Sequence, residues 1–180
     1  MKKDKNLFWI DLEMTGLDPK KDVILEIASI VTDSDLNIIA RGPELVIHQD
    51  EKHLKVMNEL VTRMHTVSGL VQRVKESTVT LEQAEKQTFD FLKTYCDQNT
   101  ALIAGNSVWK DRSFLAVYMP RIINYCHYRL LDVTAIKEVV SRWHKNHPHA
   151  VFQKKETHRA LQDIQESIAE LQHFRKYFLT

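Results

Sequence analysis

The order of hydrophobic and polar residues in the first part of the chain predicts three buried strands. Residues 7 to 12 read LFWIDL, which is apolar on both faces until Asp11, as expected for a strand in the middle of a sheet. Residues 23 to 32 and 37 to 48 are rich in β-branched side chains and are separated by the turn-like sequence DSDL. We therefore expect a meander of three strands.

Helical spacing of apolar residues follows this meander. The apolar residues between positions 50 and 63 predict one helix, and a second, short helix is expected at residues 70 to 74. Thr80 is the expected N-cap of a clearer helix, because Gln83 completes a capping box with it. The expected inner face of that helix consists of Leu81, Ala84, Phe89, Leu92 and Tyr95.

Short strands alternate with helices in the remaining part of the chain. ALIAG, residues 101 to 105, predicts a buried strand, and another short strand is expected to end at Leu131 and Asp132. Helices are expected at residues 111 to 125, 133 to 143 and 158 to 177, and a loop is expected at residues 144 to 157. This order predicts an α/β fold with a mixed five-stranded sheet flanked by helices.

Composition restricts the size and the ligands of this fold. The chain has 180 residues, which suits one domain, expected to span residues 1 to 180. Hydrophobic residues make up 43% and charged residues 27%, as in a folded protein. The formal net charge of +1 provides no strong positive field for a long phosphate backbone, so a nucleic-acid ligand should be short.

The cysteines and the N-terminus point to the cytoplasm. Cys96 and Cys126 belong to no metal-binding pattern, and reduced thiols in the core are the expected state. The N-terminal sequence MKKDKNLFWIDL is too short and too charged for a signal peptide or a membrane span. We expect no association with a membrane.

Asp11 and Glu13 are the first candidates for chemistry. They lie two residues apart on a predicted strand, so their side chains leave the same face. Two neighbouring carboxylates repel each other unless a proton or a cation lies between them. Oxygen ligands favour Mg²⁺ or Mn²⁺ over Zn²⁺. An exposed strand end is the alternative interpretation of this pair alone.

Further candidates lie in the second half of the chain. Asp111 follows the strand ALIAG where a helix is expected to begin, a position at which an acidic residue also stabilises a helix. His158 and Asp163 are five residues apart, so one helix face cannot present both, and the loop must orient His158. Taken alone, this pair is also compatible with a solvated surface.

Together, these residues and their contexts resemble a known family. The contexts are WIDLEMTGLD, AGNSVWKDRSFL and THRALQDI, together with RMHTVSGL at residues 63 to 70 and HYRLLDV at residues 127 to 133. The chain resembles the oligoribonuclease family of DEDDh 3′-to-5′ exonucleases, which have an RNase H-like fold, over essentially its whole length. Several ordered motifs at matching separations are more specific than any one of them.

The resemblance implies a mechanism and a substrate class. Asp11, Glu13, Asp111 and Asp163 are expected to hold two divalent metal ions, Mg²⁺ or Mn²⁺, with His158 as the general base. The expected substrates are very short single-stranded RNA oligonucleotides, down to dinucleotides. The expected products are nucleoside 5′-monophosphates released from the 3′ end.

The resemblance also implies residues that bind the substrate. Family members close the site on the 5′ phosphate with groups from a partner subunit, and Tyr128, Arg129 and Thr134 occupy that segment, with Ser107 on the same subunit as the metals. A guanidinium can pair bidentately with phosphate, which suits Arg129. A homodimer is therefore expected.

Several positions depart from the family pattern or contact the bases. Leu17 matches a residue that wedges between bases, whereas Leu60 stands where an aromatic residue is expected, so base stacking there is in doubt. Gln162 replaces an acidic residue, and Trp109 with Lys110 replaces a less bulky pair. None of these changes affects an expected metal ligand, so activity is expected, with an altered base preference.

Three other interpretations remain open at the sequence level. His144, His147 and His149, beside His158, could form a zinc site, although the loop lacks the fixed spacing of helical zinc ligands. A binding module could hold short RNA or a protein without cleaving it, although a pure binder has no need for a complete set of carboxylates. A proofreading or tRNA-trimming exonuclease of the same fold would differ in substrate length.

Overall fold

A mixed five-stranded sheet forms the centre of the protein in a computed structural model, which describes residues 3–154 and 159–179. The strands are β1 (Leu7–Met14), β2 (Ile24–Thr32), β3 (Ile38–Val46), β4 (Leu102–Gly105) and β5 (Leu130–Asp132). Their order is β3-β2-β1-β4-β5. The strand β2 is antiparallel to its neighbours β1 and β3, whereas β4 is parallel to β1 and β5 is parallel to β4. The predicted sheet and the α/β class are confirmed.

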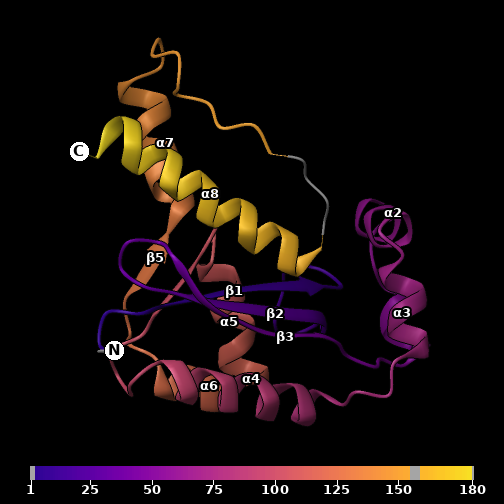
Figure 1. Ribbon diagram of the computed structural model, residues 1–180. Helices are drawn as coiled ribbons and strands as arrows, with labels where there is room; N and C mark the ends of the chain where they lie inside the picture. Colours follow the sequence, from indigo (N-terminus) through magenta and orange to yellow (C-terminus); the bar gives the residue numbers. More distant parts are fainter. Residues whose placement is uncertain (1–2, 155–158, 180) are drawn as a thin grey trace.

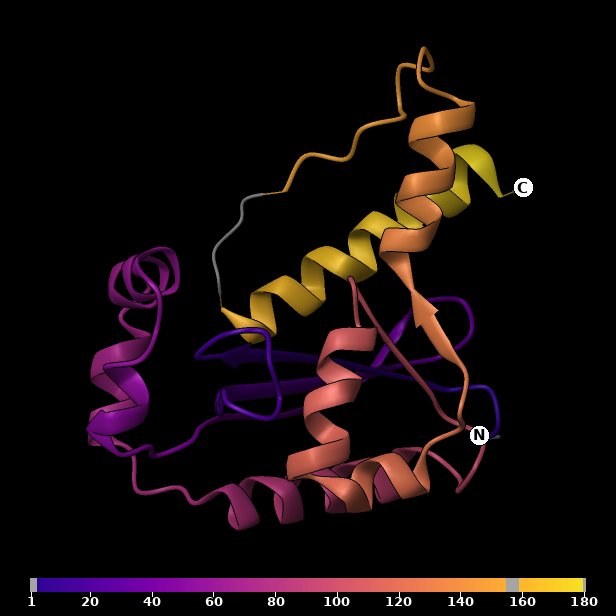
Figure 2. The same cartoon turned by 180° about the vertical axis from the view of Figure 1, so that it is seen from behind.

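Helices cover both faces of this sheet. They are α1 (Glu51–Leu54), α2 (Glu59–Val67), α3 (Leu70–Glu76), α4 (Leu81–Tyr95), α5 (Trp109–Tyr118), α6 (Pro120–Tyr125), α7 (Val133–Trp143) and α8 (Ala160–Phe178). Figures 1 and 2 show α7 and α8 on one face, α4, α5 and α6 on the other, and α2 and α3 beside the sheet. The inner strands β1 and β2 are therefore covered on both sides, whereas β3 at the edge is partly exposed.

The alternation of side chains along β1 determines where its acidic residues point. Phe8, Ile10 and Leu12 belong to the core beneath α4, α5 and α6, whereas Trp9 belongs to the core beneath α7 and α8. Side chains two residues apart leave the same face of a strand. Asp11 therefore shares the α8 face with Trp9.

Two expected helices are each divided in the structure. The helix expected at residues 50 to 63 is interrupted between α1 and α2, where the Asn58 side chain accepts a hydrogen bond from Val61 N at 2.9 Å and caps a new helix. The helix expected at residues 111 to 125 begins earlier, at Trp109, and divides at Pro120, whose nitrogen carries no hydrogen to continue the ladder. Both predictions of a single helix were wrong.

Other local predictions are confirmed. Thr80 Oγ1 accepts a hydrogen bond from Gln83 N at 3.2 Å, and Gln83 Oε1 accepts one from Thr80 N at 3.0 Å, which completes the capping box. Residues 144–154, the described part of the expected loop, contain neither helix nor strand. Cys96 and Cys126 are buried free thiols.

Among the helices of residues 3–154 and 159–179, none is both long enough and apolar enough to cross a bilayer.

The capping box predicts a measurable loss of stability. Thr80→Ala should lower the free energy of unfolding by about 1 kcal/mol, because the N–H of Gln83 loses its acceptor in the first turn of α4. Thr80→Ser keeps the hydroxyl and should stay within a few tenths of wild type. Urea unfolding followed by circular dichroism measures the difference, and equal stability of the two variants would contradict the role of the cap.

Candidate active site

Three carboxylates meet at the C-terminal end of β1. Asp11 and Glu13 lie on the strand, and Asp163 lies in the first turn of α8, which packs over the same face. One carboxylate oxygen from each residue can be chosen such that all three lie within 4.8 Å of one another. The structure thus brings together three of the four expected metal ligands, although Glu13 and Asp163 are 150 residues apart in the chain.

Asp111, the fourth expected ligand, lies beside this group. It sits in the first turn of α5, is buried, and its Oδ1 accepts a hydrogen bond from Leu12 N at 3.0 Å. Asp111 is not a member of the group of three, although its charge contributes to the raised pKa of Asp11. One oxygen of Asp111 is thus fixed to the backbone of β1, between the two acidic residues of that strand.

In the metal-free protein, burial and mutual repulsion favour the protonated form of these carboxyl groups. The pKa of Asp11 lies well above its ordinary value, first because of burial and then because of the charges of Asp111, Glu13 and Asp163. Burial, followed by the charge of Asp163, raises the pKa of Glu13 to about 8. The pKa of Asp111 rises to about 7 through burial, opposed by the hydrogen bond from Leu12 N.

These properties fit a divalent cation. The group offers only carboxylate oxygens, which are the hard ligands that Mg²⁺ and Mn²⁺ prefer. Its raised pKa values come from burial and like charge, and a cation among the oxygens would oppose the repulsion. The donor set present in the chain therefore suits the metal that the sequence led us to expect.

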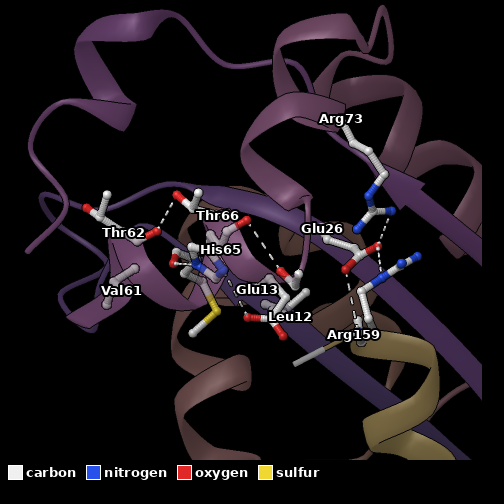
Figure 3. A network of polar contacts seen from close by, with 12 residues as sticks. Leu12, Glu13, Glu26, Val61, Thr62, His65, Thr66, Arg73 and Arg159 are labelled. Atoms are coloured by element: carbon white, nitrogen blue, oxygen red, sulfur yellow. Dashed lines mark hydrogen bonds and ion pairs between the residues drawn. The ribbon is translucent and has the colours of Figure 1, made fainter. Parts of the chain in front are cut away.

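Figure 3 shows two further titratable residues beside Glu13 that the sequence had not singled out as site residues. His65, buried on α2, makes a hydrogen bond between Nε2 and Met14 O at 2.9 Å, and its Nδ1 lies 3.9 Å from Glu13 Oε2. Glu26 lies directly across the β1–β2 ladder from Glu13 and is completely buried. The one sequence signal that could have identified Glu26 is that it is the single charged residue within the apolar run VILEIASIVT.

His158, the expected general base, lies outside the described residues. Its neighbour Arg159 is the N-cap residue of α8, and Asp163 N donates to Arg159 O at 2.9 Å. The expected role of His158 therefore stays a prediction.

The two residues expected to contact bases are both exposed. The exposed fraction is 67% for Leu17, in the loop after β1, and 66% for Leu60, on α2. Lys110 Nζ donates a hydrogen bond to Leu17 O at 2.9 Å and lies 4.3 Å from the centre of the Trp109 ring. Lys110, one of the two residues that depart from the family pattern, thus contacts the Leu17 loop. Gln162 is exposed on α8.

Ser107 and Thr134 form one hydrogen-bonded unit. Ser107 has a φ of 48°, in the left-handed region, and its N–H donates to Asp132 Oδ1 and to Thr134 Oγ1, both at 2.9 Å. Asp132 Oδ1 also accepts from Thr134 N at 3.0 Å and so caps α7. Asn106 Oδ1 accepts from Thr134 Oγ1 at 3.1 Å. These bonds hold Ser107 in a conformation that a serine rarely adopts.

Tyr128 and Arg129 lie at the opposite end of the sheet from the carboxylates. Arg129 Nε donates to Tyr128 Oη at 3.2 Å, and both residues precede Leu130, which is level with Ile103 and Phe8 in the parallel ladders. At about 3.3 Å per residue, Arg129 is about 13 Å behind Asp11 along the strand direction. The structure does not bring these two residues to the carboxylates within one chain.

The histidines of the alternative zinc site pack against aromatic rings of α8. His149 stacks on Tyr177 with ring centres 3.8 Å apart, and the rings of His144 and His147 lie 5.1 Å and 4.8 Å from that of Phe178. Within the described part of the chain, the one group of three residues close enough to hold a metal is the carboxylate group. The zinc interpretation gains no support from the described residues.

Comparison with known proteins shows the family of this chain. Residues 8–171 match the family model described as exonuclease, which defines the class of protein. Relatives named oligoribonuclease match nearly the whole chain. The protein from Pseudomonas aeruginosa is 53% identical over 179 residues, covering 99% of both chains, and that from Yersinia enterocolitica is 53% identical over 174 residues, covering 97% of this chain and 96% of its own.

The chain therefore belongs to the oligoribonuclease family of exonucleases, and it is a nuclease.

Solved structures of larger exonucleases share the fold. Exonuclease I from Methylocaldum szegediense has a TM-score of 0.71 at 16% identity, and E. coli exonuclease I in complex with an oligonucleotide has a TM-score of 0.69 at 12% identity. The matches cover 97% of this chain but 41% of each of those chains. At these identities the likeness establishes the fold alone.

The raised pKa of Glu13 predicts how stability depends on pH without metal. Between the ordinary pKa of 4.5 and about 8, the folded protein holds a proton on Glu13 that the unfolded chain releases, so stability falls as the pH rises. The loss is at most about 1.4 kcal/mol per pH unit for this group. Glu13→Gln should therefore become more stable relative to wild type as the pH rises.

Urea unfolding in EDTA at pH 5 and pH 7.5 tests this dependence. The difference between Glu13→Gln and wild type should be larger at the higher pH. A pH-independent difference between the two proteins would contradict the raised pKa.

Proposed function

We propose that the protein is a 3′-to-5′ exoribonuclease that hydrolyses very short single-stranded RNA, down to dinucleotides, to nucleoside 5′-monophosphates. The observation that carries the proposal is the group formed by Asp11, Glu13 and Asp163, found in a chain of the oligoribonuclease family. Each cleavage breaks the bond between phosphorus and the 3′ oxygen of the preceding nucleotide. Water supplies the new oxygen on phosphorus and a proton for the leaving oxygen.

Two divalent cations, Mg²⁺ or Mn²⁺, are the proposed cofactors. Asp11, Glu13 and Asp163 would hold them, with Asp111 beside the group. When bound, such cations supply Lewis-acid stabilisation of negative charge on the attacking and leaving oxygens. The hydrogen bond from Leu12 N fixes Asp111, so this carboxylate needs little rearrangement to take part.

His158 is the proposed general base. An imidazole titrates near neutral pH, which suits acceptance of a proton from the attacking water. In the sequence, His158 directly precedes Arg159, the N-cap residue of the helix whose first turn contains Asp163.

Leu17 and Leu60 are proposed to contact the bases. Both side chains are exposed, and both belong to segments that adjoin β1, because Leu17 follows the strand and His65 of α2 contacts Met14 O. An aliphatic side chain packs on a base but lacks the stacking energy of an aromatic ring. The anchor from Lys110 to Leu17 O supports a defined position of the Leu17 loop.

A homodimer is proposed to complete the site at the 5′ end of the substrate. Ser107 and Thr134 lie on the carboxylate side of β4 and β5, since Gly105 pairs with Asp132, whereas Tyr128 and Arg129 lie at the other end. A partner subunit is the proposed source of Tyr128 and of Arg129, whose guanidinium would pair with the 5′ phosphate, whereas Thr134, which was expected with them, lies beside Ser107 of its own chain. We further propose a single exonuclease domain over residues 1 to 180 and a cytoplasmic location.

The first test is cleavage of 5′-phosphorylated RNA of two and of seven nucleotides. Wild-type protein with Mg²⁺ or Mn²⁺ should release mononucleotides, faster from the dinucleotide, and EDTA should stop the reaction. His158→Ala and Asp11→Asn should each lower the rate by about a hundredfold or more, because each removes a group that acts on the reacting phosphate. Separation of products by ion-exchange chromatography measures the rates.

The outcomes distinguish the alternatives. Cleavage of the longer RNA alone would retain the nuclease site but contradict the preference for short substrates, as expected for a proofreading or tRNA-trimming enzyme. Tight binding of RNA without cleavage in any metal would instead favour a binding module.

A second prediction concerns base stacking at position 60. Leu60→Trp should tighten dinucleotide binding by about 1 to 3 kcal/mol, because an aromatic ring adds stacking energy that leucine lacks. Binding is measured by fluorescence titration in Ca²⁺, chosen to slow cleavage, and Val67→Trp, at an exposed position on the same helix, is the matched control. Equal affinity of wild type and Leu60→Trp would rule out base contact at this position.

A further inference from the structure

A buried charge in the sheet has no role in the function proposed above. Glu26 is completely buried in β2, between Leu25 and Ile27, which are also completely buried. A buried carboxylate is costly unless it is paired and hydrogen-bonded. In the antiparallel ladder, Glu26 stands opposite Glu13 of the carboxylate group, so its partners lie next to the candidate active site.

Three groups from two helices surround the Glu26 carboxylate (Figure 3). Arg73 Nη1, from α3, donates to Glu26 Oε1 at 3.0 Å, and Arg159 Nε forms an ion pair with the same oxygen at 3.8 Å. Ala160 N, at the start of α8, donates to Glu26 Oε2 at 3.5 Å. Glu26 therefore joins β2 to the N-terminal end of α8 and to α3.

Arg159 extends this connection to the neighbouring strand and to the carboxylate group. Its Nη2 donates to Glu44 Oε1 of β3 at 3.0 Å, so the side chain reaches across two strands. Its backbone oxygen accepts the N–H of Asp163 at 2.9 Å. The residue that anchors the beginning of α8 to the sheet is thus one helical turn before Asp163.

Asp163 faces the like charges of Asp11 and Glu13. The charge of Asp163 contributes to the raised pKa of both Asp11 and Glu13, so the three carboxylates favour separation when ionised and without a cation. Buried ion pairs contribute little net stability, but in some proteins they select one arrangement among alternatives. An ion pair at the first turn of α8 opposes movement of Asp163 away from β1.

We propose that Glu26 and Arg159 are positioning residues that hold Asp163 within metal-binding distance of Asp11 and Glu13. This inference rests on the proposed metal site. It assigns Glu26 and Arg159 no contact with the substrate or with the metal. Groups that orient metal ligands commonly change metal affinity by 10- to 100-fold when they are removed.

Positioning and simple electrostatics predict opposite effects for one substitution. Arg159→Gln removes a positive charge that lowers the pKa of Glu13, and by charge alone the site should then bind a cation more tightly. If Arg159 instead holds α8 in place, the same substitution frees Asp163 and weakens binding. The sign of the change in affinity therefore separates the two explanations.

The experiment measures Mn²⁺ binding without substrate, by the electron paramagnetic resonance signal of free Mn²⁺. The dissociation constant of Arg159→Gln should rise about tenfold, and Arg159→Lys, which keeps the charge with a single donor group, should show a smaller rise. Arg175→Gln is the matched control, because Arg175 pairs with Asp35 at 2.8 Å from the other end of α8. Its dissociation constant should stay within about twofold of wild type.

A double-mutant cycle with Glu26→Gln completes the test. Positioning predicts that each single variant weakens Mn²⁺ binding and that the double variant is about as weak as either one, since the same connection is lost. Charge effects alone predict opposite changes that cancel in the double variant. If Arg159→Gln fails to fold by circular dichroism, the comparison of Arg159→Lys with wild type decides, because charge alone predicts no change for lysine.

The results also separate this inference from the proposed function. No Mn²⁺ binding by the wild type would overturn the proposed metal site and the inference with it. Mn²⁺ binding by the wild type, with equal or tighter binding by Arg159→Gln, would overturn the positioning inference alone.

Discussion

The mutual repulsion of Asp11, Glu13 and Asp163 is the constraint on which the rest of the structure depends. Three half-buried carboxylates whose oxygens lie within 4.8 Å are unfavourable together in their ionised form without a compensating charge. The protein alone responds by raised pKa values, and a divalent cation would oppose the repulsion in the working state. The surrounding elements must therefore keep the three groups together against their own charges.

Two features of the fold meet this requirement. Strand parity fixes Asp11 and Glu13 on the α8 face of β1, the central strand of the sheet, and both residues pair with β2 in the antiparallel ladder. Asp163 lies on a helix, which can shift more easily than a central strand. The connection from Arg159 to Glu26 and Glu44 is located at the end of α8 where such a shift would begin.

The sequence predicted what depends on local patterns. Period-two alternation was sufficient to place Asp11 and Glu13 on one face, and the capping box at Thr80 was readable because its two partners are three residues apart. Each of the two expected long helices is divided at a residue that could have been read from the sequence, Asn58 as an N-cap and Pro120 as a helix breaker. The spacing of the apolar residues favoured continuous helices instead. The approach of Asp163 to β1 follows from packing across 150 residues and was expected only from the family resemblance.

Glu26 shows why the remainder was out of reach of local patterns. A single charged residue within the run VILEIASIVT, Glu26, suggests a side chain that faces solvent, yet both faces of β2 are covered. The arginines that compensate its charge, Arg73 and Arg159, follow it by 47 and 133 residues in the chain, so no local spacing identifies them. A lone acidic residue in a strand that is covered on both faces, such as Glu26, needs a cationic partner that only the folded structure identifies.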